Sequence, residues 1–220
     1  MIEAIDLSCT RGERLLFSGL SLTIKPGELL TVLGENGSGK TSLLRMLCGL
    51  LPPARGMIRW EGTDIGQMKE EYVARITYIG HLHGIKDDLT PAENLQFSAQ
   101  ICGDAASAIL TSEALEAVGL RRSIHGLPTR VLSQGQKRRV ALARLWLSTG
   151  DLWILDEPFA ALDDAGSRLL TQRLQRHVER GGMGVVAVRH RGVGQVLPGA
   201  KTAAGAGQHD AAHARIGRRG

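Results

Sequence analysis

The sequence has few aromatic residues and no long hydrophobic run, and both shortages narrow the class of protein. Phenylalanine, tryptophan and tyrosine make up only 4% of the 220 residues, although hydrophobic residues, at 43%, are numerous enough to fill a core. No run approaches the roughly 18 apolar residues of a membrane span, and the N-terminus lacks the apolar region of a signal peptide. We therefore expect one α/β domain with room for a small subdomain.

Cysteine content and charge limit the compartment and the partners. The three cysteines, Cys9, Cys48 and Cys102, form no C-x-x-C pair, which suits reduced thiols in a cytoplasm. The net charge of +5 comes from the C-terminal end, because residues 1–180 hold 21 of the 27 lysines and arginines and 21 of the 22 acidic residues. A neutral body with a basic tail argues against a nucleic-acid partner.

One glycine-rich segment meets every fixed position of the phosphate-binding loop G-x-x-x-x-G-K-[ST]. It reads Gly34-Glu35-Asn36-Gly37-Ser38-Gly39-Lys40-Thr41. An apolar strand is expected before it at 29–33, and a helix closed by Gly49 after it at 41–48. An ordinary glycine turn is the plain alternative. Backbone N–H groups at such a junction bind phosphate, however, while Lys40 can reach the β- and γ-phosphates and the Thr41 hydroxyl can ligate Mg²⁺.

The expected elements predict an α/β core interrupted by helices. Strand patterns in the first sixty residues indicate an antiparallel β element around the strand of the phosphate loop; they cover 2–7, 20–24, 29–33 and 57–60. Helical patterns between about 85 and 135 indicate an inserted subdomain, with a capping box at Thr90–Glu93 and helices at 92–101 and 112–118. The core then resumes with alternating helices and strands, expected at 135–147, 152–155, 164–179 and 185–188.

A second group of residues indicates what the nucleotide is for. Ser133 opens the expected helix at 135–147, and Asp156 and Glu157 follow the expected strand at 152–155. A carboxylate there can hold Mg²⁺, and Glu157 can orient or deprotonate the attacking water of a hydrolase. Taken alone, Ser133 would be a helix cap and the acidic pair a polar turn. Together with the phosphate loop, they favour a nucleotide hydrolase.

In these motifs the chain resembles the nucleotide-binding subunits of ABC transporters over about residues 1–190. The family's signature matches Leu132–Gln136, and its Walker B strand with the catalytic glutamate matches Leu152–Glu157. Its D-loop matches Ala161-Leu162-Asp163, and its switch histidine, which senses the γ-phosphate, matches His190. The resemblance implies a P-loop NTPase core of the ABC type, with an antiparallel β subdomain and an inserted helical signature subdomain.

The resemblance also implies a mechanism and partners. Two copies would pair head to tail, with ATP and Mg²⁺ between the phosphate loop of one copy and the signature of the other. The residues expected to bind the nucleotide are Gly34, Glu35, Asn36, Gly37, Ser38, Gly39, Lys40, Thr41, Ser133, Gly135 and Gln136. Thr41 and Asp156 would hold Mg²⁺, while Lys40, Glu157 as base and His190 would be catalytic. Polytopic partner subunits would place the chain peripherally on the cytoplasmic face of the bacterial inner membrane.

Two departures from the general family pattern narrow the resemblance. Cys9-Thr10-Arg11 stands where an adenine-stacking aromatic residue is usual, and Arg11 can stack through its guanidinium plane. His81 stands where most relatives have a glutamine that touches Mg²⁺. It is a further candidate ligand of the ion, or else His81 and His83 are polar loop residues.

Both stretches, at 9–17 and 78–86, are similar to the ATP-binding export subunits of cytochrome c maturation. That subfamily implies a chain that powers haem export or the release of a haem-loaded periplasmic chaperone. An ABC ATPase for another substrate is the nearest alternative, because partner proteins choose the substrate. A soluble ATPase acting on DNA or ribosomes usually has paired cassettes or long coiled coils, which this sequence lacks. A silent regulatory subunit is disfavoured by the presence of both Lys40 and Glu157.

The C-terminal end departs from the family, which has a short final strand there. Glycine and alanine supply 18 of the last 40 residues, without strand or helix periodicity. Residues 191–220 are therefore expected to form a disordered, Gly/Ala-rich basic tail. A natural tail and a shifted reading frame both remain open explanations.

Overall fold

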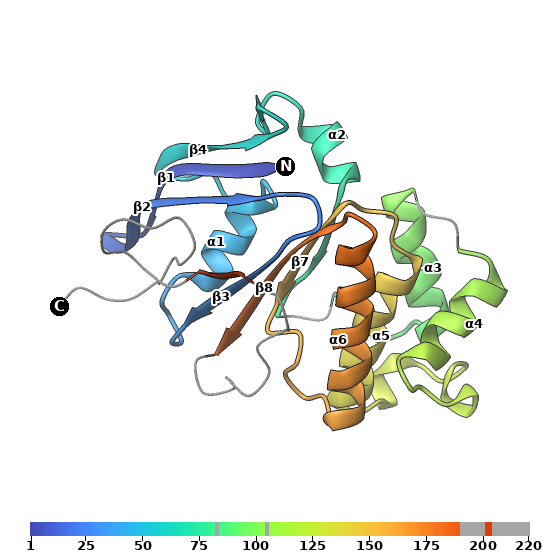
Figure 1. Ribbon diagram of the computed structural model, residues 1–220. Helices are drawn as coiled ribbons and strands as arrows, with labels where there is room; N and C mark the ends of the chain where they lie inside the picture. Colours follow the sequence, from blue (N-terminus) through green and yellow to red (C-terminus); the bar gives the residue numbers. More distant parts are fainter. Residues whose placement is uncertain (82–83, 104–105, 190–200, 204–220) are drawn as a thin grey trace. The chain divides into compact units, whose positions relative to one another are not determined.

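The computed structural model describes residues 1–81, 84–103, 106–189 and 201–203, which fall into two compact units (Figure 1). In the described part of the chain, the first unit comprises 1–78, 151–157, 177–189 and 201–203, and the second comprises the described residues of 79–150 and 158–176. The insertion expected at about 85–135 lies within the second unit, which extends further on both sides. His190 and most of the expected tail lie outside the described residues.

Two β-sheets build the first unit. The antiparallel sheet has the order β2-β1-β4-β5, and its strands are β1 (Ile2–Arg11), β2 (Arg14–Ile24), β4 (Arg55–Trp60) and β5 (Thr63–Asp64). The other sheet has the order β6-β7-β8-β3-β9, and its strands are β3 (Leu29–Gly34), β6 (Ile76–Ile79), β7 (Leu152–Asp156), β8 (Met183–Arg189) and β9 (Lys201–Ala203). In this second sheet β3 pairs in parallel with β8 and β9, and β7 pairs in parallel with β8.

One hydrophobic core joins the two sheets through α1 (Lys40–Leu47). Leu43, Leu44 and Leu47 of α1 are fully buried among side chains of both sheets. Each such side chain contributes about 1.5–3 kcal/mol through the hydrophobic effect. The short helix α2 (Lys69–Ala74) adds the buried ring of Tyr72, which packs against Trp60. The helix that follows the phosphate loop is thus held firmly in the core.

Four helices and two 3₁₀ turns form the second unit. They are α3 (Pro91–Cys102), α4 (Ala108–Ala117), η1 (Arg122–Ile124), η2 (Thr129–Val131), α5 (Gln134–Leu147) and all but the last turn of α6 (Asp164–Glu179). Leu95, Leu115 and Val140 are buried where α3, α4 and α5 meet. Within the described ranges, no helix has the length and apolar character that crossing a bilayer requires.

The antiparallel strands differ most from the sequence predictions. β1 and β2 are longer than expected, because the register of their pairing shifts between Ala4 and Thr10 and Asp6 adopts φ +50°. Such bulges break the alternation of buried and exposed residues from which strands are predicted. The short elements α2, β5 and β6 were not predicted.

Two further differences concern α4 and the tail. α4 begins four residues before the expected helix at 112–118, because Ser107 caps it by accepting a hydrogen bond from the Leu110 amide. Within the expected tail, Lys201–Ala203 form β9 beside β3. A three-residue strand needs backbone hydrogen bonds and no long side-chain pattern, so periodicity does not reveal it.

Candidate nucleotide-binding site

The phosphate loop lies where β3 ends, at an edge of the parallel sheet where three predicted segments end together. Gly34 ends β3 beside Arg189, the last residue of β8, and Asp156 ends β7 beside Ala187. Ligands of parallel sheets bind at the carboxyl ends of the strands, which is this edge. The topology therefore brings the loop and the acidic pair of the sequence prediction together.

The loop has the backbone of an anion cradle. Gly37 and Gly39 adopt φ +77° and φ +98°, which other residues rarely reach, and a Cβ on Gly39 would lie 3.0 Å from the Phe17 ring. Gly39 caps α1, whose first turn contains no acidic residue and no side-chain cap. The partial positive charge of this helix end is therefore left for a ligand.

Ser38 supplies a second sign of a ligand. Its hydroxyl oxygen is buried, yet it has no hydrogen-bond partner in the described part of the chain. Buried polar atoms of proteins are nearly always paired, and an unpaired one at a helix N-terminus matches a phosphate oxygen. The loop thus fits the nucleotide that its sequence predicts.

Lys40 lies inside this loop. Its Nζ donates hydrogen bonds to the carbonyl oxygens of Gly34 at 2.7 Å and Glu35 at 3.0 Å, and its side chain is only 7% exposed. The same Nζ lies 3.7 Å from Oε1 of Glu157. An ammonium group held over the loop in this way can donate to phosphate oxygens that enter it.

Thr41 and Asp156 form a pair of oxygen donors. Thr41 Oγ1 donates to Asp156 Oδ2 at 2.7 Å, and Asp156 is 1% exposed. Burial, with the negative charge of Asp156 as the next cause, raises the pKa of Tyr78. Hydroxyl and carboxylate oxygens suit Mg²⁺. Among the described residues, no group of three or more His, Cys, Asp or Glu side chains gathers.

Glu157 lies between two cations. Its Oε1 is 3.7 Å from Lys40 Nζ and 3.6 Å from Arg189 Nε, and its side chain is 14% exposed. Its backbone has φ +51°, and its amide donates to the Ala187 carbonyl at 3.0 Å. A strained backbone at a partly buried carboxylate is a feature of functional sites. Sequence reasoning missed Arg189, whose one signal is its place directly before His190.

The signature segment lies in the second unit and forms the N-terminus of α5. Ser133 and Gln136 make a capping box, in which Ser133 Oγ accepts from the Gln136 amide and Gln136 Oε1 accepts from the Ser133 amide. A Cβ on Gly135 would lie 3.0 Å from the Ala161 carbonyl, so this position has little room for a side chain. The capping groups are uncharged and the first turn has no acidic residue, so no side chain of this turn neutralises the partial positive charge of the helix end.

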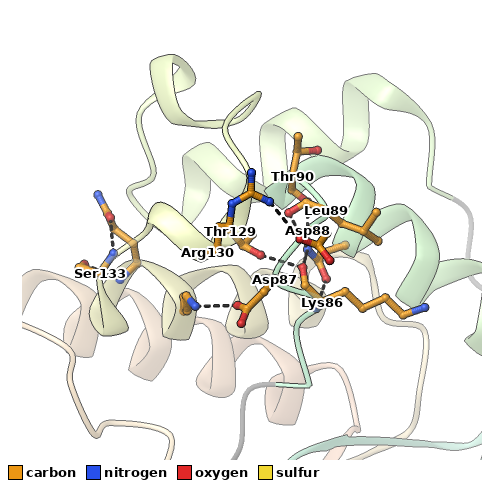
Figure 2. A network of polar contacts seen from close by, with 11 residues as sticks. Lys86, Asp87, Asp88, Leu89, Thr90, Thr129, Arg130 and Ser133 are labelled. Carbon is orange, nitrogen blue, oxygen red and sulfur yellow. Dashed lines mark hydrogen bonds and ion pairs between the residues drawn. The ribbon is translucent and has the colours of Figure 1, made fainter.

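A network of polar contacts connects the segment 86–90 with residues 129–137, which include the signature (Figure 2). The Thr129 amide donates to the Leu89 carbonyl at 2.9 Å, and its buried hydroxyl donates to the Lys86 carbonyl at 2.8 Å. Asp87 accepts from Lys137 Nζ at 2.6 Å. Buried Thr129 is a polar side chain that sequence reasoning overlooked, because nothing near it in sequence marks it as buried.

The predicted site residues that lie after the loop glycines fall into three groups. Lys40, Thr41, Asp156 and Glu157 are brought together in the first unit, whereas Ser133, Gly135, Gln136 and His81 belong to the second unit. His81 is exposed in the bend after Gly80. His83 and His190 lie outside the described residues. Cys9, Cys48 and Cys102 are free thiols, and burial raises the pKa of Cys48.

Comparison with known proteins agrees with this geometry. The family model "ABC transporter" matches residues 17–160. The chain is 50% identical over 191 residues to the cytochrome c biogenesis ATP-binding export protein CcmA of Nitrosospira multiformis, covering 86% of this chain and 91% of that protein. It is 50% identical over 187 residues to the protein of the same name from Methylococcus capsulatus, covering 85% and 90%.

Solved structures show the same fold. A putative ABC transporter ATP-binding protein from Pyrococcus furiosus has a TM-score of 0.76 at 24% identity, covering 86% of this chain and 91% of that one. A dimeric ATP-binding cassette with bound ADP and phosphate has a TM-score of 0.77 at 23% identity, covering 88% and 90%.

Proposed function

The chain belongs to the ABC transporter family, and from this premise we propose that it is the ATP-hydrolysing subunit of an export system for cytochrome c biogenesis. The observation that carries the enzymatic part is the cluster of Lys40, Thr41, Asp156 and Glu157 beside a glycine loop with an uncapped helix N-terminus. The pathway rests on relatives with half of their residues identical over most of the chain.

The residues of the first unit have distinct roles in this proposal. The amides of the loop from Gly34 to Gly39 and the ammonium group of Lys40 bind the phosphates of ATP. Thr41 and Asp156 hold Mg²⁺, which, when bound, neutralises charge on the phosphate oxygens. Glu157, whose Oε1 lies 3.7 Å from Lys40 Nζ, accepts a proton from the attacking water.

The second unit supplies the other half of the proposed site. Ser133, Gly135 and Gln136 lie at a helix N-terminus without acidic residues, which would bind the ATP held by the phosphate loop of a second copy in a head-to-tail dimer. His81 and His190 are proposed to contact the ion or the γ-phosphate. ATP-driven closure would act on polytopic membrane subunits at the cytoplasmic face of the inner membrane, to export haem or release a haem-loaded periplasmic chaperone.

A deletion strain of the native host tests this function. Deletion of the gene is expected to abolish covalent haem in c-type cytochromes, as seen by haem staining of membrane proteins. The wild-type chain and Lys69→Ala, which changes an exposed lysine of α2, should restore the stain, whereas Lys40→Ala should not. Normal c-type cytochromes in the deletion strain, or co-purification of the tagged chain with a sugar or lipid permease, would contradict the assignment.

A further inference from the structure

Arg138 is a buried charge outside the groups that bind the nucleotide. It lies on α5, five residues after Ser133, and only 2% of it is exposed. A guanidinium group with so little access to water must be satisfied by hydrogen bonds, because burying an unpaired charge costs several kcal/mol. Its partners therefore show what it holds.

Two of these partners are backbone carbonyl oxygens far apart in sequence. Arg138 Nη1 donates to the Gly80 carbonyl at 2.9 Å, and Nε donates to the Pro158 carbonyl at 3.4 Å. Gly80 directly precedes His81, and Pro158 directly follows Glu157. One side chain of the signature helix thus contacts the chain next to a candidate Mg²⁺ contact and next to the candidate base.

Both carbonyls also lie where the chain enters the second unit. The chain passes between the units at four places, namely 78/79, 150/151, 157/158 and 176/177. Gly80 and Pro158 are the second and first residues of the second unit at two of these crossings. Arg138 therefore holds the backbone at or next to two of the four crossings.

Neighbouring residues of α5 hold the loop that follows Pro158. Arg139 Nη2 bonds to Asp163 Oδ1 at 2.5 Å, and Gly135 packs closely against the Ala161 carbonyl. The first half of α5 is therefore connected to Pro158, Ala161 and Asp163 of this loop. Arg138 extends this connection to Gly80, 58 residues earlier in the chain.

We propose that Arg138 is a positioning residue for ATP hydrolysis. Its hydrogen bonds to the carbonyls of Gly80 and Pro158 hold the backbone next to His81 and Glu157, and so set the positions of these two residues. This inference rests on the proposed function. Arginine suits the role because its planar group carries several donors that reach separate acceptors, whereas lysine has one nitrogen and methionine none. Loss of these two hydrogen bonds should slow the chemical step and leave phosphate binding by Lys40 and Thr41 unchanged.

The test uses the full chain with Arg138→Met and Arg138→Lys. The control is Arg168→Met, which changes an exposed arginine of α6. Turnover and KM for ATP with Mg²⁺ are measured below the melting temperature of each variant, and nucleotide affinity is measured in a Glu157→Gln background. We expect Arg138→Met to lower kcat at least about tenfold, because small misplacements of catalytic groups have effects of this size. KM and nucleotide affinity should change less than about twofold, and Arg138→Lys should fall between.

A double variant separates positioning from a structural role. If Arg138 acts through the loop of His81, the combined Arg138→Met and His81→Ala variant should lose less activity than the product of the two single losses. Multiplicative losses, or a wild-type kcat in folded Arg138→Met, would overturn the proposal. If Arg138→Met does not fold, a wild-type kcat in Arg138→Lys overturns it and a reduced kcat at unchanged KM supports it. A wild-type chain without turnover would instead refute the proposed function.

Discussion

Asn94 of α3 is the residue whose replacement should most clearly disturb the polar contacts around Lys86 and Leu89. Its side chain is 7% exposed, and its Oδ1 accepts from the Lys86 amide at 2.8 Å. Its Nδ2 donates to three carbonyl oxygens, at 3.0 Å for Lys86, 3.3 Å for Leu89 and 3.1 Å for Thr90. We predict that Asn94→Leu, which keeps the size of the side chain, destabilises the protein.

The magnitude follows from what the neighbours retain. In Asn94→Leu the Lys86 amide loses its hydrogen-bond partner. The carbonyls of Lys86, Leu89 and Thr90 each lose one donor, but those of Lys86 and Leu89 keep hydrogen bonds from Thr129. The lost partner of the Lys86 amide costs about 1 kcal/mol, and the three carbonyls, which keep other donors, together cost about 1 kcal/mol more, so the total is about 2 kcal/mol. For a chain of this size, that corresponds to a fall in melting temperature of about 4–8 °C.

Thermal denaturation followed by circular dichroism measures this loss. Gln100→Leu, an exposed amide on the same helix, is the matched control and should melt like the wild type. An Asn94→Leu variant that melts within about 1 °C of the wild type would refute the assigned energy of these contacts.

Three further predictions concern other parts of the chain. Thr41→Val should weaken Mg²⁺-dependent ATP binding about tenfold, because it removes the hydroxyl that bonds to Asp156, whereas Thr41→Ser keeps the hydroxyl and should bind like the wild type. An unchanged Mg²⁺ titration in Thr41→Val would count against the ion site. Hydrogen bonds from Thr90 hold the pKa of Glu93 below its ordinary value of 4.5, so its contribution to stability is present above that value and is lost as the pH falls through the lower pKa of the folded state. The stability difference between wild type and Glu93→Ala, measured by denaturation, should therefore shrink in acid; a pH-independent difference would contradict this. Gly182→Ala should cost about 1–3 kcal/mol, because the added Cβ would lie 2.3 Å from the His177 ring, and His177→Ala should relieve that loss; two additive losses in denaturation would argue against the clash.

The elements that were predicted correctly depend on residues that are close together in the sequence. The phosphate loop, the capping box at Thr90 and the strand that ends in Asp156 each depend on residues within a few positions, so their patterns are visible in sequence. The structure confirms these elements and brings Lys40, Thr41, Asp156 and Glu157 together.

Contacts between distant segments explain the rest. Arg138 reads as an ordinary basic residue of an exposed helix, and only the fold shows that its guanidinium bonds Gly80 and Pro158. Arg189 meets Glu157 because β7 and β8 are neighbours in the sheet. The bulges of β1 likewise arise from pairing with β2 and β4, which no local alternation records.

ATP turnover by the full chain, with and without the Glu157 carboxylate, tests the central claim most directly. The wild-type chain should hydrolyse ATP when Mg²⁺ is present. Glu157→Gln should bind ATP with wild-type affinity but lose at least about a hundredfold in kcat, because a general base contributes a factor of about 10²–10⁴. Unchanged turnover in Glu157→Gln would contradict the assignment of the base and of the site built around it.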